Sequence, residues 1–271
     1  MKGERMGKVT IPKLKDMKEH GEKITMLTAY DYPIARLLDQ AGIHMLLVGD
    51  SLGMVMLGYP NTLPVTMEEM LHHTRAVARG AQDALVIGDM PFMSFNLGPT
   101  DAIRNAGRFI KQGGASAVKL EGCGEPMVAI TRAIVEAGIG VMGHIGLTPQ
   151  FIHQMGGFRV QGRDRDQAQL LLDGAKRLED AGIFSLVLEG IPPNLAATIT
   201  RALSIPTIGI GAGVECDGQV LVIHDLLGFT GQKPPKFVKQ YAHLYETMLE
   251  AVKAFSAEVQ SGAFPSDDYT Y

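Results

Sequence analysis

The chain lacks tryptophan, has only two cysteines among 271 residues, and contains no long uncharged apolar run. Cys123 and Cys216 have no metal-type spacing, and two cysteines do not make a disulfide framework. No apolar stretch approaches the roughly 20 residues of a membrane span, so we expect no membrane partner. The polar N-terminal segment has no apolar core of a signal peptide. These features together predict a cytoplasmic protein.

Positive charge is also scarce. The 25 Lys and Arg against 29 Asp and Glu give a net charge of −4, and no basic cluster is interleaved with aromatics. This argues against nucleic acid as a partner. No G-x-G-x-x-G motif opens the first expected helix, so a dinucleotide site has little support. The composition, 46% hydrophobic and 20% charged, is ordinary for a soluble globular enzyme.

What the chain does have is eight apolar, strand-like runs, most of them followed by an amphipathic stretch. Alternating β and α segments at this pitch predict parallel strands joined by right-handed crossovers. Eight such units favour a closed (β/α)8 TIM barrel, an α/β fold, with an open doubly wound sheet as the alternative. We expect one domain over residues 1–271, with an N-terminal extension and a C-terminal helix. The runs cover residues 24–31, 44–51, 84–92, 116–122, 140–147, 185–190, 206–213 and 219–228.

Several boundaries can be predicted from local signals. Thr66 followed three residues later by Glu69 is a capping box that starts a helix reaching about Arg79. Residues 51–65 and 151–166 read as loops after their strands. The segment 236–259, after Pro234, reads as the terminal helix.

Four acidic residues stand at the ends of four of the apolar runs: Asp50, Asp89, Glu121 and Glu189. Each has an ordinary alternative as a turn, helix-capping or solvated residue. A carboxylate at the end of a buried strand is costly unless something pairs with it. Because the strand ends of a parallel barrel converge on one rim, we expect the four to meet there. Three carboxylates held together predict a hard cation such as Mg²⁺, and the fourth, Glu189, is available as a general base.

Two basic side chains also lie on the apolar runs. Lys119 and Glu121 alternate with period two, so both point to one face of a strand, either as a functional pair or as a structural ion pair. His144 lies inside an apolar run, where a lone histidine is more often a hydrogen-bonded core residue than a functional one.

The longest motifs of the chain resemble one known family. They are TAYDYPIARLLDQAGI, LLVGDSLGMVMLGYPNTLPVTMEEMLHHTRAVARG, GDMPFMSF, AVKLEG, VMGHIGLTPQ and PTIGIGAG-x₄-DGQVLVIHDLLG, between about Ile11 and Tyr245. They are similar to those of ketopantoate hydroxymethyltransferase. The resemblance implies a barrel of the phosphoenolpyruvate/pyruvate-binding type and assembly as a homodecamer.

The resemblance also implies an activity. The family transfers a hydroxymethyl group from 5,10-methylenetetrahydrofolate to 3-methyl-2-oxobutanoate, giving 2-dehydropantoate (ketopantoate), through a Mg-stabilised enolate. This is a step of pantothenate and coenzyme A biosynthesis. One Mg²⁺ per subunit is implied. Two alternatives are a related Mg²⁺-dependent lyase, whose KKCGH-type cysteine motif is absent here, and a catalytically inactive barrel.

The family's functional positions carry over onto residues of this chain. The metal positions fall on Asp50, Asp89 and Glu121, the last acting directly or through water. The proton acceptor falls on Glu189. One departure is Cys123, where the family usually has glycine, and it leaves the shape of that loop in doubt. The substrate-binding positions fall on Asp50, Ser51, Asp89, Lys119 and His144.

Overall fold

Eight parallel strands close into a barrel in which each strand pairs with the next and β8 returns to β1. The computed structural model describes residues 7–157 and 159–271 of the chain. The closed (β/α)8 prediction is confirmed, and the open sheet is excluded. The strands are β1 (Ile24–Thr28), β2 (Met45–Val48), β3 (Leu85–Asp89), β4 (Ala117–Glu121), β5 (Gly140–Gly146), β6 (Ser185–Glu189), β7 (Thr207–Ile210) and β8 (Gly218–Leu221).

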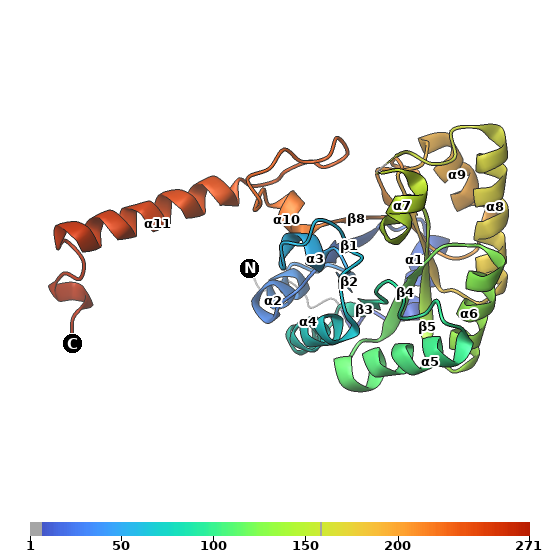
Figure 1. Cartoon of the computed structure of the whole chain (residues 1–271), viewed down its shortest axis with the longest axis horizontal. Coiled ribbons are helices and arrows are strands. Elements are labelled where there is room, and N and C mark those ends of the chain that lie inside the picture. Colours follow the sequence, from blue (N-terminus) through green and yellow to red (C-terminus); the bar gives the residue numbers. More distant parts are fainter. Residues whose placement is uncertain (1–6, 158) are drawn as a thin grey trace. The chain divides into compact units, whose positions relative to one another are not determined.

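The helices that follow the strands cover the outside of the barrel (Figure 1). The predicted capping box is present at the start of α4, where Thr66 Oγ1 accepts from the Glu69 amide and the Glu69 carboxylate accepts from the Thr66 amide. The helices after the strands are α2 (Tyr32–Gln40), α4 (Met67–Gly80), α5 (Pro99–Arg108), α6 (Glu125–Glu136), α8 (Arg165–Asp180) and α9 (Pro193–Ala202).

Two stretches that the sequence predicted as loops contain short helices. α3 (Leu52–Val55) follows β2, and the 3-10 turn η2 (Pro149–Phe151) runs into α7 (Ile152–Met155) after β5. The loop prediction is wrong at these points because single turns need no amphipathic repeat and leave no periodic signal. A π-helical turn, η1 (Phe109–Gly113), follows α5 directly and prolongs it.

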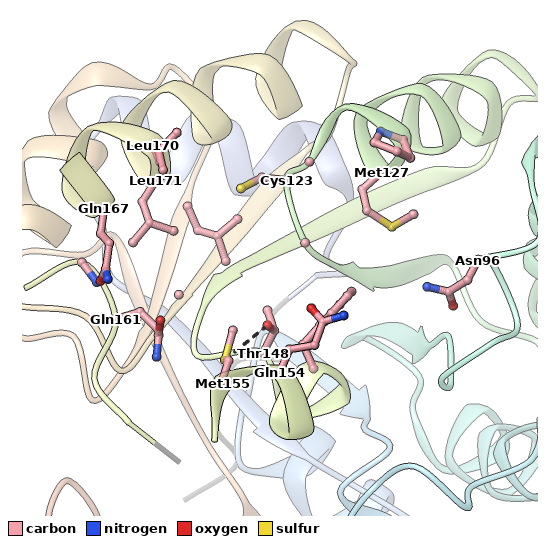
Figure 2. A pocket seen from close by; sticks show the side chains of 17 residues that line it. Asn96, Cys123, Met127, Thr148, Gln154, Met155, Gln161, Gln167, Leu170 and Leu171 are labelled. Atoms are coloured by element: carbon pink, nitrogen blue, oxygen red, sulfur yellow. Dashed lines mark hydrogen bonds between the residues drawn. The ribbon is translucent and has the colours of Figure 1, made fainter. Parts of the chain in front are cut away.

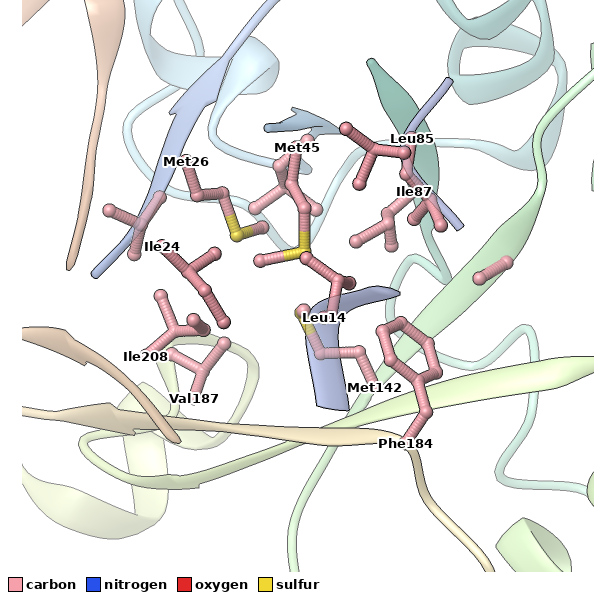
Figure 3. Close-up of a cluster of buried hydrophobic side chains, with 14 of the residues drawn as sticks. Leu14, Ile24, Met26, Met45, Leu85, Ile87, Met142, Phe184, Val187 and Ile208 are labelled. Carbon is pink, nitrogen blue, oxygen red and sulfur yellow. The ribbon is translucent and has the colours of Figure 1, made fainter. Parts of the chain in front are cut away.

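An N-terminal helix, α1 (Ile11–Glu19), contributes to the barrel core, although the sequence predicted only an extension there. Thr10 caps it, and Leu14 and Met17, three residues apart, are buried. Figure 3 shows Leu14 beside strand residues such as Met45 and Met142, in one cluster of buried apolar side chains. The interior is therefore a packed core, as in other eight-stranded barrels.

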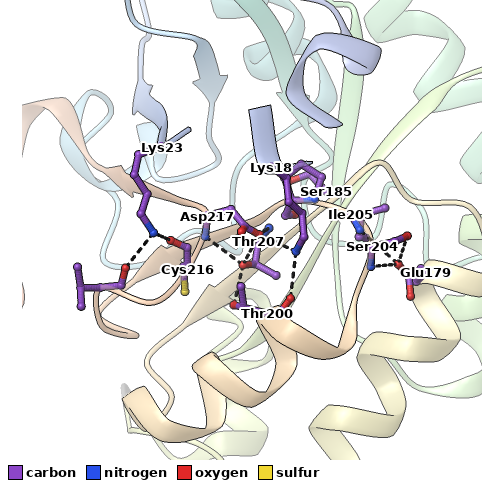
Figure 4. Close-up of polar contacts among 12 residues, drawn as sticks. Lys18, Lys23, Glu179, Ser185, Thr200, Ser204, Ile205, Thr207, Cys216 and Asp217 are labelled. Carbon is purple, nitrogen blue, oxygen red and sulfur yellow. Dashed lines mark hydrogen bonds and ion pairs between the residues drawn. The ribbon is translucent and has the colours of Figure 1, made fainter. Parts of the chain in front are cut away.

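A polar network joins α1 to the later strands. Lys18 donates to Asp217 Oδ2 at 2.8 Å and to the Thr200 carbonyl at 3.0 Å. The same Asp217 oxygen accepts from the amide and the hydroxyl of Thr207, at 2.8 and 3.0 Å. Figure 4 shows these contacts converging on Asp217. They hold the chain in place where β7 leads to β8.

Residues 222–271 form a second compact unit, which holds α10 (Ile223–Leu226), α11 (Leu244–Ser261) and η3 (Asp267–Tyr269). The predicted helix over 236–259 begins later, at Leu244. The preceding segment is not helical because the Tyr241 and Leu244 amides donate to the carbonyls of Leu226 and Leu227. The single-domain organisation stays a prediction. In the part of the chain that the structure describes, no helix combines the length and apolar character of a membrane span.

Candidate active site

The four predicted carboxylates lie at the carboxyl-terminal rim of the barrel. Asp89, Glu121 and Glu189 are the last residues of β3, β4 and β6, and Asp50 follows the end of β2 by two residues. Asp50, Asp89 and Glu121 are buried. This is the end at which barrels of this kind hold their active sites.

The strand register brings basic residues between the carboxylates. Asp89 pairs with Lys119 across β3 and β4, and Glu121 pairs with His144 across β4 and β5. Lys119 Nζ lies 2.6 Å from Asp89 Oδ1 and 3.7 Å from Glu121 Oε1. Lys119 therefore bridges two carboxylates, with Asp89 as its nearer partner.

His144 lies between the remaining two carboxylates. Its Nδ1 is 3.2 Å from Glu121 Oε1, and its Nε2 is 3.2 Å from Glu189 Oε2. Both distances suit ion pairs, although neither ring nitrogen has the angles of a regular hydrogen bond. His144 is buried, as expected of a core histidine, but its partners are two of the four strand-end carboxylates, and its role toward the substrate stays a prediction.

Gln150, in η2, is a member of the cluster that the sequence did not predict. Its backbone amide donates to Glu121 Oε2 at 3.0 Å, and its side-chain amide donates to Asp50 Oδ2 at 3.0 Å and to the Met90 carbonyl at 2.9 Å. The side chain is buried. Its only sequence signal is its place six residues after His144, directly before a predicted loop, which indicates nothing about its partners.

Two further contacts complete the rim near β2. The Asp50 amide donates to Asp89 Oδ2 at 3.2 Å. The Ser51 hydroxyl lies 2.8 Å from the hydroxyl of Tyr30, a buried residue just after β1. Ser51 is thus held next to Asp50 at the edge of the acidic cluster, and its substrate-binding role stays a prediction.

The cluster has more negative than positive charge. Burial, together with Asp89 and Glu121, raises the pKa of Asp50 well above its ordinary value. Burial also raises the pKa of Asp89, although Lys119 opposes that effect. For Glu121, burial is more than offset by His144 and Lys119, and the pKa is lowered.

Burial acts in the opposite direction on the pKa values of the two cationic side chains, but the carboxylates around them outweigh it. Burial alone would lower the pKa of Lys119, but Asp89, Glu121 and Asp50 together raise it. In the same way Glu121 and Glu189 overcome the effect of burial and raise the pKa of His144 to about 9. Both side chains therefore carry a positive charge at neutral pH.

The donor set fits a hard divalent cation by charge and chemistry. Four carboxyl groups face only two cationic side chains, Lys119 and His144, and the neighbouring Asp89 and Glu121 help to raise the pKa of Asp50 well above its ordinary value. Carboxylate oxygens are the ligands that Mg²⁺ prefers. Within residues 7–157 and 159–271, no three His, Cys, Asp or Glu side chains converge as a preformed metal group. The oxygens of Asp89 and Glu121 instead face Lys119, which lies between them.

A cavity of about 760 Å³ lies beside the cluster and takes in the residues directly after β4 (Figure 2). Its walls come from the end of β5, from the segments that follow β4 and β5, and from Asn96 after β3. None of the four carboxylates lines it, but Gly122, the residue after Glu121, does. The sequence did not predict this cavity.

Comparison with known proteins agrees with this geometry. The family model of ketopantoate hydroxymethyltransferase matches residues 8–267. The chain belongs to the ketopantoate hydroxymethyltransferase family. Relatives of this family named 3-methyl-2-oxobutanoate hydroxymethyltransferase include those of Carboxydothermus hydrogenoformans and Moorella thermoacetica, each 57% identical. The first match covers 98% of this chain and 96% of the relative, and the second covers 97% and 98%.

Solved structures of other families share the fold. A phosphonopyruvate hydrolase in complex with oxalate and Mg²⁺ superposes with a TM-score of 0.62 at 14% identity, over 96% of this chain and 93% of that one. A 2,3-dimethylmalate lyase of the PEP mutase/isocitrate lyase superfamily gives a TM-score of 0.60 at 16% identity, over 96% and 91%. These similarities confirm the fold, an eight-stranded α/β barrel, for this member of the ketopantoate hydroxymethyltransferase family.

Proposed function

We propose that the rim cluster transfers a hydroxymethyl group from 5,10-methylenetetrahydrofolate to 3-methyl-2-oxobutanoate, giving 2-dehydropantoate for pantothenate and coenzyme A biosynthesis. Family membership supports this activity. The observation that carries it is the convergence of four carboxylates, Lys119 and His144 on one rim. Such a site can bind an anionic keto acid, remove a proton from it and neutralise the charge that develops.

Asp50 and Asp89 would hold Mg²⁺ and meet the substrate, with Glu121 as the third ligand, directly or through water. A bound Mg²⁺ would supply Lewis-acid polarisation of the keto group. The excess negative charge of the cluster and its hard oxygen donors support this assignment. Gln150 helps to fix Glu121 and Asp50 through its backbone amide and its side-chain amide.

Lys119 and Ser51 would orient the substrate carboxylate. The Lys119 ammonium is charged and buried, and a cation in a dry site attracts an anion far more strongly than in water. The Ser51 hydroxyl, held by Tyr30, can donate a hydrogen bond. His144 would face the substrate and fix the carboxylate of Glu189 through Nε2.

Glu189 would act as the general base. The proton to be removed is on the carbon that bears the two methyl groups, and the resulting carbanion attacks the one-carbon unit of the folate. Glu189 is the least buried of the four carboxylates, with its side chain 16% exposed. Its ion-pair partner among the described residues is His144, not Lys119. It therefore stays accessible to substrate while the other three form the cradle.

Deuterium exchange tests the base without the folate. We expect Glu189→Gln to bind 3-methyl-2-oxobutanoate but to exchange its proton with D₂O about 10²–10⁴ times more slowly, the usual contribution of a positioned base. Glu179→Gln is a matched control on α8. Undiminished exchange in Glu189→Gln would remove Glu189 from this role.

Metal removal and folate dependence test the rest of the proposal. We expect EDTA to abolish turnover and Mg²⁺ to restore it in the parent chain but not in Asp50→Ala or Asp89→Ala. Full activity in excess EDTA contradicts the metal assignment. If product forms only when the folate is present, the chain is the transferase and not a lyase. If neither deuterium exchange nor product is detected, the chain is an inactive barrel.

The assembly proposed for the chain is a homodecamer, supported by the family alone. Sedimentation equilibrium should give ten times the chain mass, and a monomer or dimer at working concentration would contradict it. The cytoplasmic location stays a prediction.

A further inference from the structure

The cavity beside the carboxylate cluster contains none of the four carboxylates, so the chemistry proposed for the cluster does not account for it. It begins at the carboxyl ends of β4 and β5, where Gly122 directly follows Glu121 and Gly146 pairs with Glu189. Gly122 has φ +102°, a backbone conformation that favours glycine. Because Gly122 has no side chain, a ligand in the cavity can approach the backbone next to Glu121.

The chemistry of the walls limits what can bind. No charged side chain is among the described residues that line the cavity. Apolar side chains form most of the wall, including Met127, Phe151 and Leu171. Such a lining disfavours phosphates and carboxylates and favours a flat, neutral ring system.

Amide side chains supply the polar contacts. Figure 2 shows Gln161 and Gln167 on one side of the cavity and Asn96 on the other. Each carboxamide offers both donors and acceptors without a charge. A heteroaromatic ring whose edge alternates donors and acceptors matches this arrangement.

We propose that this cavity binds the pterin and aminobenzoyl rings of the folate co-substrate and leaves the glutamate tail in solvent. This inference rests on the proposed transferase activity. A volume of about 760 Å³ is within the range of ligand pockets, roughly 300–1,000 Å³. The small keto acid occupies the carboxylate cluster, so the two substrates meet where Gly122 and Gly146 separate the cluster from the cavity.

A charge placed in the wall tests the proposal. In Leu171→Glu, a carboxylate replaces an apolar contact, and we expect the folate KM to rise at least about tenfold, as for a lost contact in an apolar pocket. Titration calorimetry with tetrahydrofolate should show the same loss of affinity. Leu37→Glu, an exposed leucine of α2 that does not line the cavity, is the matched control and should leave both values unchanged.

Cys123 provides a second readout that does not depend on turnover. It lines the cavity and is partly exposed, whereas Cys216, the other cysteine, is buried. We expect tetrahydrofolate to slow alkylation of Cys123 by a maleimide at least about tenfold at saturating ligand, as mass action requires when the bound form is protected. Alkylation at an unchanged rate, with tetrahydrofolate bound, overturns the proposal.

Deuterium exchange into 3-methyl-2-oxobutanoate separates this inference from the proposed function. Leu171→Glu should retain the exchange rate of the parent chain, because its effect falls on the folate alone. An unchanged folate KM in Leu171→Glu, with exchange and transfer intact in the parent chain, overturns the cavity assignment only. Loss of exchange and transfer in the parent chain overturns the proposed function.

Discussion

Replacing His144 by glutamine removes the cation between Glu121 and Glu189 while keeping a polar side chain of similar length. Burial alone would lower the pKa of His144, but the two carboxylates raise it from 6.5 to about 9. Since one pKa unit corresponds to 1.36 kcal/mol, the proton on His144 stabilises the fold by roughly 3 kcal/mol. His144→Gln should lose about that much of the free energy of unfolding below pH 6.5.

The pH dependence of this loss follows from the sign of the shift. The folded chain binds the His144 proton more tightly than the unfolded chain does, so the stabilisation is complete below pH 6.5, the ordinary pKa. It declines as the pH rises through the folded pKa of about 9. Above that value the histidine is neutral in both states, and the parent chain and the variant should differ little from this cause.

Urea unfolding in EDTA, measured at intervals from pH 6.5 to 10, checks the prediction in the absence of bound metal. The difference between the parent chain and His144→Gln should shrink across this window. His72→Gln, which replaces an exposed histidine of α4, should follow the parent chain. A difference that stays constant from pH 6.5 to 10 would refute the reasoning, because it would mean that His144 contributes by packing rather than by charge.

Three further substitutions test other contacts of the fold and the site. Lys119→Met should lower the free energy of unfolding by about 3–5 kcal/mol, because it leaves Asp89 buried without its cation; a loss under 1 kcal/mol in urea would contradict this. Asp217→Asn should lower the free energy of unfolding by about 1.5–3 kcal/mol, because it weakens the contacts to α1 and β7. We expect the KM for 3-methyl-2-oxobutanoate to stay unchanged, and a changed KM would show that this network also affects the active site. Gly146→Ala should slow deuterium exchange by up to about a hundredfold, because its Cβ would overlap the backbone of Glu189; exchange at the parent rate would exclude that displacement.

Much of the site followed from the sequence because it depends on local periodicity. Period-two alternation placed Lys119 and Glu121 on one face of β4, and the structure has them 3.7 Å apart. Four carboxylates at strand ends had to meet once the strands closed into a barrel. What the sequence did not show was that Lys119 lies closer to Asp89, because that depends on the register between β3 and β4.

The sequence by itself determined the barrel, the rim on which the carboxylates gather and, through its long motifs, the family. Those properties are encoded by alternation along the chain, which short-range sterics and burial enforce. Only the tertiary structure decided the place of Gln150 between Asp50 and Glu121, the packing of α1 into the core and the cavity next to Gly122. Each of these depends on the path of a loop or an end of the chain, and that path is set by contacts with residues far away in the sequence.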